Sequence, residues 1–322
     1  MAVLSKTSRS PATPLPIIGE YALTSPWSTS SAGTAMWSFA KKGGRDYFIK
    51  MFISPVLPNA DSKLPPELIA KKREMCEEFY RRGKRVYDAV NKSDTGNIVL
   101  IDDFFFYKTK YYLVTEKIDN MVITSKAISE RPTETKLLLL KVLSYSLRAL
   151  HNNDVVHGDL KSSNILFVRK NYNVLIPKLI DFGDSFLESD PKSNIVGDVY
   201  LSPEGCALMN GEKIRLSRKS DVFSMGLLFH EFFTGELPTF DSEYDYPCEA
   251  VASGSTLTLN KGLLPGLDTL IRSMLLLYPD RRPSMDEVFE SLKGLQNKTT
   301  DPHEIEPPEV ESPFKRLSSS DF

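Results

Sequence analysis

Residues 157–164 read His157-Gly158-Asp159-Leu160-Lys161-Ser162-Ser163-Asn164, and Asp181-Phe182-Gly183 begins 17 residues after the last of them. Transfer of the terminal phosphoryl group of ATP requires a carboxylate that orients the attacking hydroxyl, a cation near the phosphates and oxygen ligands for Mg²⁺. Asp159, Lys161, Asn164 and Asp181 supply these groups. The spacing therefore predicts a phosphoryl-transfer centre.

Upstream of this centre the chain is dominated by short strand-forming runs. Alternating and β-branched or aromatic residues occupy 17–23, 34–40, 47–52, 98–106 and 111–117. The hairpin sequence Lys41-Lys42-Gly43-Gly44 joins the second and third runs, so we expect them to be neighbours in an antiparallel sheet. A long helix, predicted to begin near Pro65-Pro66 and to end near Asn91, interrupts the strands.

After about residue 119 the pattern changes to helices. Periodic Leu, Phe and Met residues predict them at 133–152, 219–234, 266–277 and 285–295. We therefore expect an α+β fold with a small strand-rich lobe and a larger helical lobe, and we expect a nucleotide in the cleft between them.

These features together resemble the eukaryotic-type serine/threonine protein kinase family. Three further segments carry the resemblance: Tyr200-Leu201-Ser202-Pro203-Glu204, Ser220-Asp221-Val222-Phe223-Ser224-Met225-Gly226 and Arg281-Arg282-Pro283. It implies a protein kinase domain over residues 17–295, with the small lobe at about 17–118 and the large lobe at about 119–295. Segment 1–16 is rich in Ser, Thr and Pro, and segment 296–322 is rich in Pro, Glu and Ser. Both flanking segments are expected to be flexible.

The resemblance also implies roles for single residues of the large lobe. Asp159 becomes the base and orienting group, Lys161 lies near the transferred phosphoryl group, and Asn164 and Asp181 hold Mg²⁺. Asp221 is expected to support the backbone of the catalytic loop. Glu204 and Arg282 are expected to pair, the alternative being two separate surface charges.

For ATP, the resemblance implies a site built mainly from the small lobe. Lys50 closes the run Tyr47-Phe48-Ile49-Lys50 and matches the family's strand lysine, which neutralises phosphates. The segment 28–35 falls where the family has its glycine-rich phosphate cover. The other expected contacts are Ser28, Ser30 and Gly33 with the phosphates, Ala35, Phe48 and Leu166 with adenine, and the backbone of Glu116 and Ile118 at the hinge.

Several residues depart from the family pattern. Of the three glycines of the phosphate cover only Gly33 is present, and Phe48 occupies a place usually held by alanine. The helix glutamate that pairs with the strand lysine is not assigned: Glu74, Glu77 and Glu78 are candidates, yet Gly83 lies near the expected position. These departures leave open a nucleotide-binding pseudokinase that serves as a scaffold.

Gly158 stands where many of these kinases carry arginine, the residue that reads a phosphorylated activation loop. We therefore predict that activity depends less on phosphorylation of Ser185, Ser189 or Ser193 than it does in the members with that arginine. His-Gly-Asp is also found in aminoglycoside and choline kinases, which form a second alternative, but the three large-lobe segments favour a protein kinase. Lys161 favours serine and threonine acceptors, and autophosphorylation of the tail stays open because basic residues precede serines at 315–320.

Composition narrows the remaining classes. Forty basic against 42 acidic residues give a net charge of −2, so no nucleic-acid partner is expected. The three cysteines lack metal-ligand spacing, and no signal peptide or membrane span is recognised, so we expect a cytoplasmic protein with reduced thiols. The basic residues of the long helix, among them Arg81, Arg82 and Arg85, are expected to form a solvated face, the alternative being a docking surface for an acidic partner.

Overall fold

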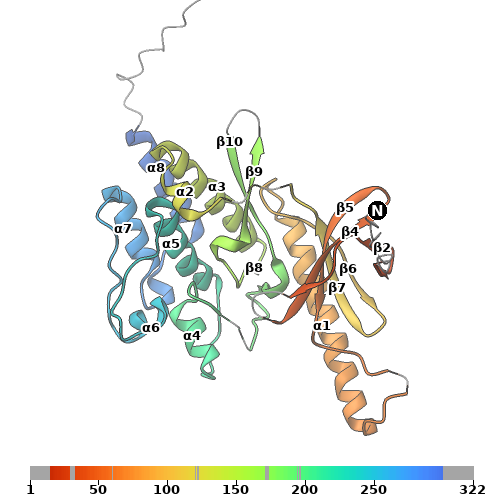
Figure 1. Cartoon of the computed structure of the whole chain (residues 1–322). Coiled ribbons are helices and arrows are strands. Elements are labelled where there is room, and N and C mark those ends of the chain that lie inside the picture. Colours follow the sequence, from red (N-terminus) through yellow and green to blue (C-terminus); the bar gives the residue numbers. More distant parts are fainter. Residues whose placement is uncertain are drawn as a thin grey trace, which may run out of the picture.

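The computed structural model describes residues 15–29, 33–59, 61–119, 121, 123–170, 174–193, 195 and 197–299. Within them the chain forms a curled antiparallel sheet with one long helix, and a larger assembly of helices beside it (Figure 1). The expected two-lobed α+β fold is therefore confirmed. Residues 1–14 and 300–322 lie outside the described residues, so the flexibility expected of both ends stays a prediction.

The sheet of the small lobe has the order β1-β2-β4-β5-β7-β6, with β3 paired to β4. At the β4–β5 hairpin, Lys42 pairs with Arg45, and Gly43 and Gly44 have φ angles of 57° and 80°. This left-handed geometry at both central residues suits a tight hairpin and favours glycine. The strands are β1 (Ile17–Ile18), β2 (Tyr21–Leu23), β3 (Ser28–Thr29), β4 (Ala35–Lys42), β5 (Arg45–Phe52), β6 (Ile101–Tyr107) and β7 (Lys110–Glu116).

The two faces of this sheet differ. Ala40, Ile49, Tyr112 and Val114 belong to a buried apolar cluster on one face. Lys50 alternates with Ile49 along β5 and so points to the other face, toward the large lobe. The alternation of the strand therefore places the lysine where the phosphate site was expected.

Helix α1 (Pro66–Lys92) packs beside the sheet and begins, as expected, with proline in its first turn. A Cβ atom at Gly83 would lie 2.6 Å from the ring of Phe104 on β6, so glycine permits this close approach. The predicted strand 98–106 starts three residues late because Asn97 and Val99 instead exchange backbone hydrogen bonds with Leu179.

In the large lobe the central helix is α5, which is buried nearly all round and ends at Gly235 in the left-handed conformation. The four predicted long helices are all present, whereas the short elements were not foreseen. The helices are α2 (Ser125–Ser129), α3 (Thr133–Asn152), α4 (Pro203–Met209), α5 (Arg218–Thr234), α6 (Pro247–Ala252), α7 (Pro265–Met274) and α8 (Met285–Thr299). The short strands are β8 (Val155–Val156), β9 (Ile165–Lys170), β10 (Val174–Leu179) and β11 (Phe186–Leu187).

These short strands position the candidate site. β8 pairs with β11 and β9 pairs with β10, so the loop between β8 and β9 lies next to the segment between β10 and β11. Figure 1 shows these strands between the helical lobe and the sheet. No helix among the described residues is long and apolar enough to cross a membrane.

Candidate active site

The loop from His157 to Asn164 brings three predicted residues into direct contact. Lys161 Nζ lies 2.9 Å from Asp159 Oδ1, and Asn164 Nδ2 donates to Asp159 Oδ2 at 2.9 Å and to the Asp159 carbonyl oxygen at 2.7 Å. Burial raises the pKa of the Asp159 carboxyl, and the nearby Lys161 ammonium opposes this only partly. The result is a carboxylate of fixed orientation with greater basicity than an ordinary aspartate.

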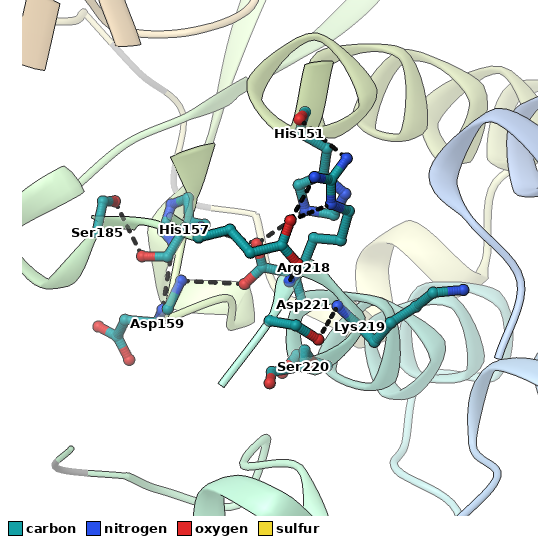
Figure 2. Close-up of polar contacts among 12 residues, drawn as sticks. His151, His157, Asp159, Ser185, Arg218, Lys219, Ser220 and Asp221 are labelled. Atoms are coloured by element: carbon teal, nitrogen blue, oxygen red, sulfur yellow. Dashed lines mark hydrogen bonds and ion pairs between the residues drawn. The ribbon is translucent and has the colours of Figure 1, made fainter. Parts of the chain in front are cut away.

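Asp221, in the first turn of α5, holds the backbone of this loop (Figure 2). Its carboxylate accepts hydrogen bonds from the backbone N–H groups of His157 at 2.7 Å and Gly158 at 3.0 Å, and it lies 3.0 Å from His151 Nε2. Ser185 Oγ donates to the His157 carbonyl oxygen at 2.9 Å. The expected supporting role of Asp221 is thereby confirmed.

His157 itself is buried and packs within the loop. Its Nε2 lies 3.1 Å from the carbonyl oxygen of Ile180, and its ring centre is 5.1 Å from that of Phe182. The next residue, Gly158, has φ of 77°, and a Cβ atom there would lie 2.8 Å from the Asp184 carbonyl oxygen. The backbone conformation and the close Asp184 carbonyl oxygen therefore both favour glycine at 158, where many of these kinases carry arginine.

Asp181 meets Lys50 across the two lobes. Lys50 Nζ lies 2.6 Å from Asp181 Oδ1, although 131 residues separate them in sequence. Asp181 adopts φ of 63°, an uncommon conformation for a residue with a side chain, and its carboxylate accepts from Gly183 N at 3.3 Å. The structure therefore unites the strand lysine and the second predicted metal ligand in one ion pair.

The three candidate helix glutamates are not partners of Lys50 within the described residues. Glu78 instead pairs with Arg81 on the same helix. Gly83 lines the same open cavity as Lys50, about 740 Å³ in volume, between β5, α1 and the segment after Asp181. Because a side chain at 83 would collide with Phe104, α1 offers no carboxylate at that point.

The expected phosphate cover is described only in part. Ser28 lies in β3, which pairs with β4, and Gly33 has φ of 67° with open space beyond its Cα. Ser30 lies outside the described residues. Ala35, the first residue of β4, is buried, Glu116 ends β7 with Ile118 two residues beyond it, and Leu166 lies in β9.

Phe48 belongs to an aromatic cluster with Trp37 and Phe39, which was not predicted from the sequence. Its ring lies 5.7 Å from that of Trp37 in a stacked arrangement and 6.3 Å from that of Phe39. Phe39 is directly opposite Phe48, and Trp37 directly opposite Lys50, so all three rings share the Lys50 face of the sheet. This cluster could have been predicted from the sequence, because Ala35, Trp37 and Phe39 alternate along one strand and so share one face of the sheet.

Glu204 and Arg282 form a buried, bidentate ion pair, so the alternative of two surface charges is wrong. Arg282 Nη1 and Nη2 donate to the two carboxylate oxygens of Glu204 at 2.7 and 2.8 Å, and the Arg282 side chain is 0% exposed. Three carbonyl oxygens, of Lys219, Leu276 and Leu277, accept its remaining N–H groups. This pair fixes α4 against the start of α5 and the turn before α8.

Asp198, two residues before Tyr200, also contacts the loop from His157 to Asn164, which the sequence did not predict. Its carboxylate lies 3.2 Å from Lys161 Nζ. Burial acts to lower the pKa of Lys161, but the carboxylates of Asp159 and Asp198 outweigh it and raise that pKa. Tyr200 Oη lies 2.8 Å from Ser162 Oγ and 2.6 Å from Glu231, which adds a second link to the loop.

The three serines considered as phosphorylation sites are in different environments. Ser189 and Ser193 are exposed, and Ser189 Oγ contacts Asp154. Ser185 is buried and donates to the catalytic loop. Ser185 is therefore a structural residue of the site, because its hydroxyl is enclosed and already bonded.

The basic face of α1 is only partly solvated. Arg81 is exposed, as expected, whereas Arg82 and Arg85 reach Asp190 in the segment that follows β11. Arg85 is nevertheless exposed, as expected, whereas Arg82 is partly enclosed because Asp190, far away in sequence, lies beside it.

Comparison with known proteins gives a consistent result. Residues 69–292 match the model of the protein kinase domain. The chain is 25% identical over 249 residues to the ovarian-specific serine/threonine-protein kinase Lok of Drosophila melanogaster, covering 75% of this chain and 49% of that protein. It is 30% identical over 173 residues to the serine/threonine-protein kinase PrkC of Bacillus subtilis, covering 52% of this chain and 25% of that protein.

A third relative is a calcium/calmodulin-dependent serine/threonine-protein kinase of Malus domestica, 28% identical over 208 residues, covering 62% of this chain and 49% of that protein. The chain thus spans about half or less of the length of these three relatives.

Proposed function

The chain belongs to the protein kinase domain family, and on this premise we propose that it transfers the γ-phosphoryl group of ATP to serine or threonine hydroxyls of proteins. The observation that carries the proposal is the joint placement of Asp159, Lys161, Asn164, Asp181 and Lys50 at one site. We place the catalytic domain at 17–295, with the lobe boundary near residue 118.

In this proposal Asp159 orients the acceptor hydroxyl and takes its proton. Its raised pKa favours proton acceptance, and its contacts with Lys161 and Asn164 fix the direction of its oxygens. Lys161 stays protonated between two carboxylates and offers a positive charge to the phosphoryl group. Both residues act through position and charge, which is what a loose phosphoryl-transfer transition state requires.

The donor set also suits Mg²⁺. Asn164 uses its Nδ2 atom toward Asp159, which leaves its amide oxygen as a ligand, and Asp181 adds carboxylate oxygens. When bound, Mg²⁺ neutralises the charge on the phosphate oxygens. Lys50, already beside Asp181, is the cation proposed to meet the α and β phosphates of ATP.

The remaining contacts with ATP are proposals of the same kind. Ser28, Ser30 and Gly33 would cover the phosphates, while Ala35, Phe48 and Leu166 would enclose the adenine. The backbone of Glu116 and Ile118 would bond the adenine edge. Protein substrates would present a serine or threonine hydroxyl to Asp159, and autophosphorylation and a cytoplasmic location stay predictions.

The test is transfer of γ-labelled phosphate from Mg·ATP to the protein itself and to a generic protein substrate, with Asp159→Asn as the matched variant. We expect labelled phosphoserine or phosphothreonine, reduced by about 10²-fold or more in the variant. Folded protein that binds ATP but labels nothing above the variant would instead support a pseudokinase, for which the lack of a helix carboxylate beside Lys50 is the favouring observation. A panel of aminoglycosides and choline tests the small-molecule alternative.

A further inference from the structure

Arg82, the residue before Gly83 on α1, reaches out of its helix to the segment that follows β11. Its Nη2 atom donates to the carbonyl oxygens of Asp190 at 2.8 Å and Pro191 at 3.1 Å, and lies 3.1 Å from Asp190 Oδ1. Arg85, one turn later, lies 3.4 Å from the other carboxylate oxygen, Asp190 Oδ2. One acidic residue therefore meets two arginines of α1.

Asp190 is itself fixed to the base of the catalytic loop. Its backbone N–H donates to the Leu187 carbonyl oxygen at 2.8 Å, and Leu187 pairs with Val155 in β8, directly before the loop. Glu188, between them, accepts from Arg218 N at 3.0 Å and Arg218 Nε at 2.6 Å (Figure 2 shows Arg218 beside the Asp221 cluster). A continuous set of contacts thus runs from α1 to the catalytic loop.

The same region lacks the other obvious link between α1 and the site. Lys50 pairs with Asp181, and at Gly83 the helix passes too close to Phe104 to carry a carboxylate toward Lys50. Buried apolar residues hold α1 against the core, and Glu78, which also lines the cavity with Lys50 and Asp184, is paired with Arg81, so a charged link from α1 to the site has to come from another residue. Arg82 has the required reach, because it contacts the segment that begins only a few residues after Asp181.

We propose that Arg82 and Asp190 are positioning residues, and that their contact couples α1 to the catalytic centre in place of an ion pair between Lys50 and a helix glutamate. The inference rests on the proposed kinase function. Because the anion is a carboxylate of the chain itself, this coupling needs no added phosphate. Arg82 is the principal partner because it has three acceptors, whereas Arg85 has one, at the longer distance.

The test compares Arg82→Ala, Asp190→Asn and their double variant with Arg81→Ala. Arg81 is the matched control, because it has the same charge on the same helix but is exposed and pairs only with its helical neighbour Glu78 among the described residues. We expect Arg82→Ala and Asp190→Asn each to lower kcat by about tenfold with a smaller change in KM for a protein substrate. The loss in the double variant should be smaller than the product of the two single losses, because the Arg82–Asp190 ion pair is common to both, although Asp190 also contacts Arg85 and Arg82 also contacts two backbone carbonyls.

Arg82→Lys keeps the charge without the planar fork and should restore part of kcat. The proposal would be overturned if Arg82→Ala and Arg81→Ala had the same kcat. It would also be overturned if the fold-losses of kcat in the two single variants multiplied in the double variant. Hydrogen exchange separates this result from failure of the kinase function. If the wild type transfers no phosphate, faster exchange in α1 and 184–192 for Arg82→Ala and Asp190→Asn, but not Arg81→Ala, still supports the coupling, and unchanged exchange rejects it.

Discussion

The half of the molecule that holds the proposed catalytic centre and the half that holds the proposed nucleotide site are built on different kinds of contact. In residues 157–292 the decisive interactions are charged and specific, such as Asp221 with the loop backbone and Glu204 with Arg282. Around β3, β4 and β5, apart from the pair of Lys50 with Asp181, they are mainly ring stacking and backbone conformation. The family match starts at residue 69, inside α1, and so leaves Lys50 and the proposed phosphate cover outside it. A charged contact requires particular residue types, whereas many different residue types can form an apolar surface or a turn of the backbone.

The largest effect we expect comes from removing one partner of the buried ion pair between Glu204 and Arg282. Glu204→Gln leaves the fully buried Arg282 guanidinium without its anion, so the free energy of unfolding should fall by about 3–5 kcal/mol. Glu290→Gln is the control, because its pair with Lys293 is exposed and its removal should change that free energy by about 0.5 kcal/mol or less. Urea denaturation of both variants measures the difference, and equal stabilities would show that the buried pair does not hold the half with the proposed catalytic centre together.

A smaller effect on the free energy of unfolding is expected from a change in the half that holds the proposed nucleotide site. Phe48→Ala removes the stacking with Trp37, which should lower the free energy of unfolding by about 1 kcal/mol beyond the loss of buried area. Because the ring lies on the Lys50 face, where a phenyl group in place of the family's usual alanine would narrow the proposed adenine site, its removal should also lower KM for ATP while kcat changes little.

Phe39→Ala is the comparison for this variant, since it leaves the ring of Phe48 in place. Steady-state kinetics and tryptophan fluorescence on ATP addition are the measurements. A rise in KM for ATP on Phe48→Ala would mean that the ring contributes contacts to adenine rather than narrowing its site.

This contrast also explains how much the sequence could predict. Asp159, Asn164 and Asp181 lie together as expected because the loop and the strands that place them are short and their spacing is fixed. The Glu204 and Arg282 pair could be foreseen only through the family resemblance, because 78 residues separate its partners. The contact of Arg82 with Asp190 could not be foreseen at all: a basic helix and an acidic loop residue have no spacing signal that relates them.

The smallest effect should come from the exposed serines after Asp181. With Gly158 in place of arginine and Asp190 already paired with Arg82, no added phosphate is needed to hold this segment, so Ser189→Ala with Ser193→Ala should leave kcat within about twofold of wild type. Ser185→Ala differs, because it removes the hydrogen bond to the His157 carbonyl and should cost about 1 kcal/mol of stability. Kinetics on protein treated with phosphatase provide the same comparison without mutation. If the variant lost activity while its fold stayed intact, phosphorylation of Ser189 or Ser193 would be required. The carboxylate of Asp190 would then not replace that phosphate.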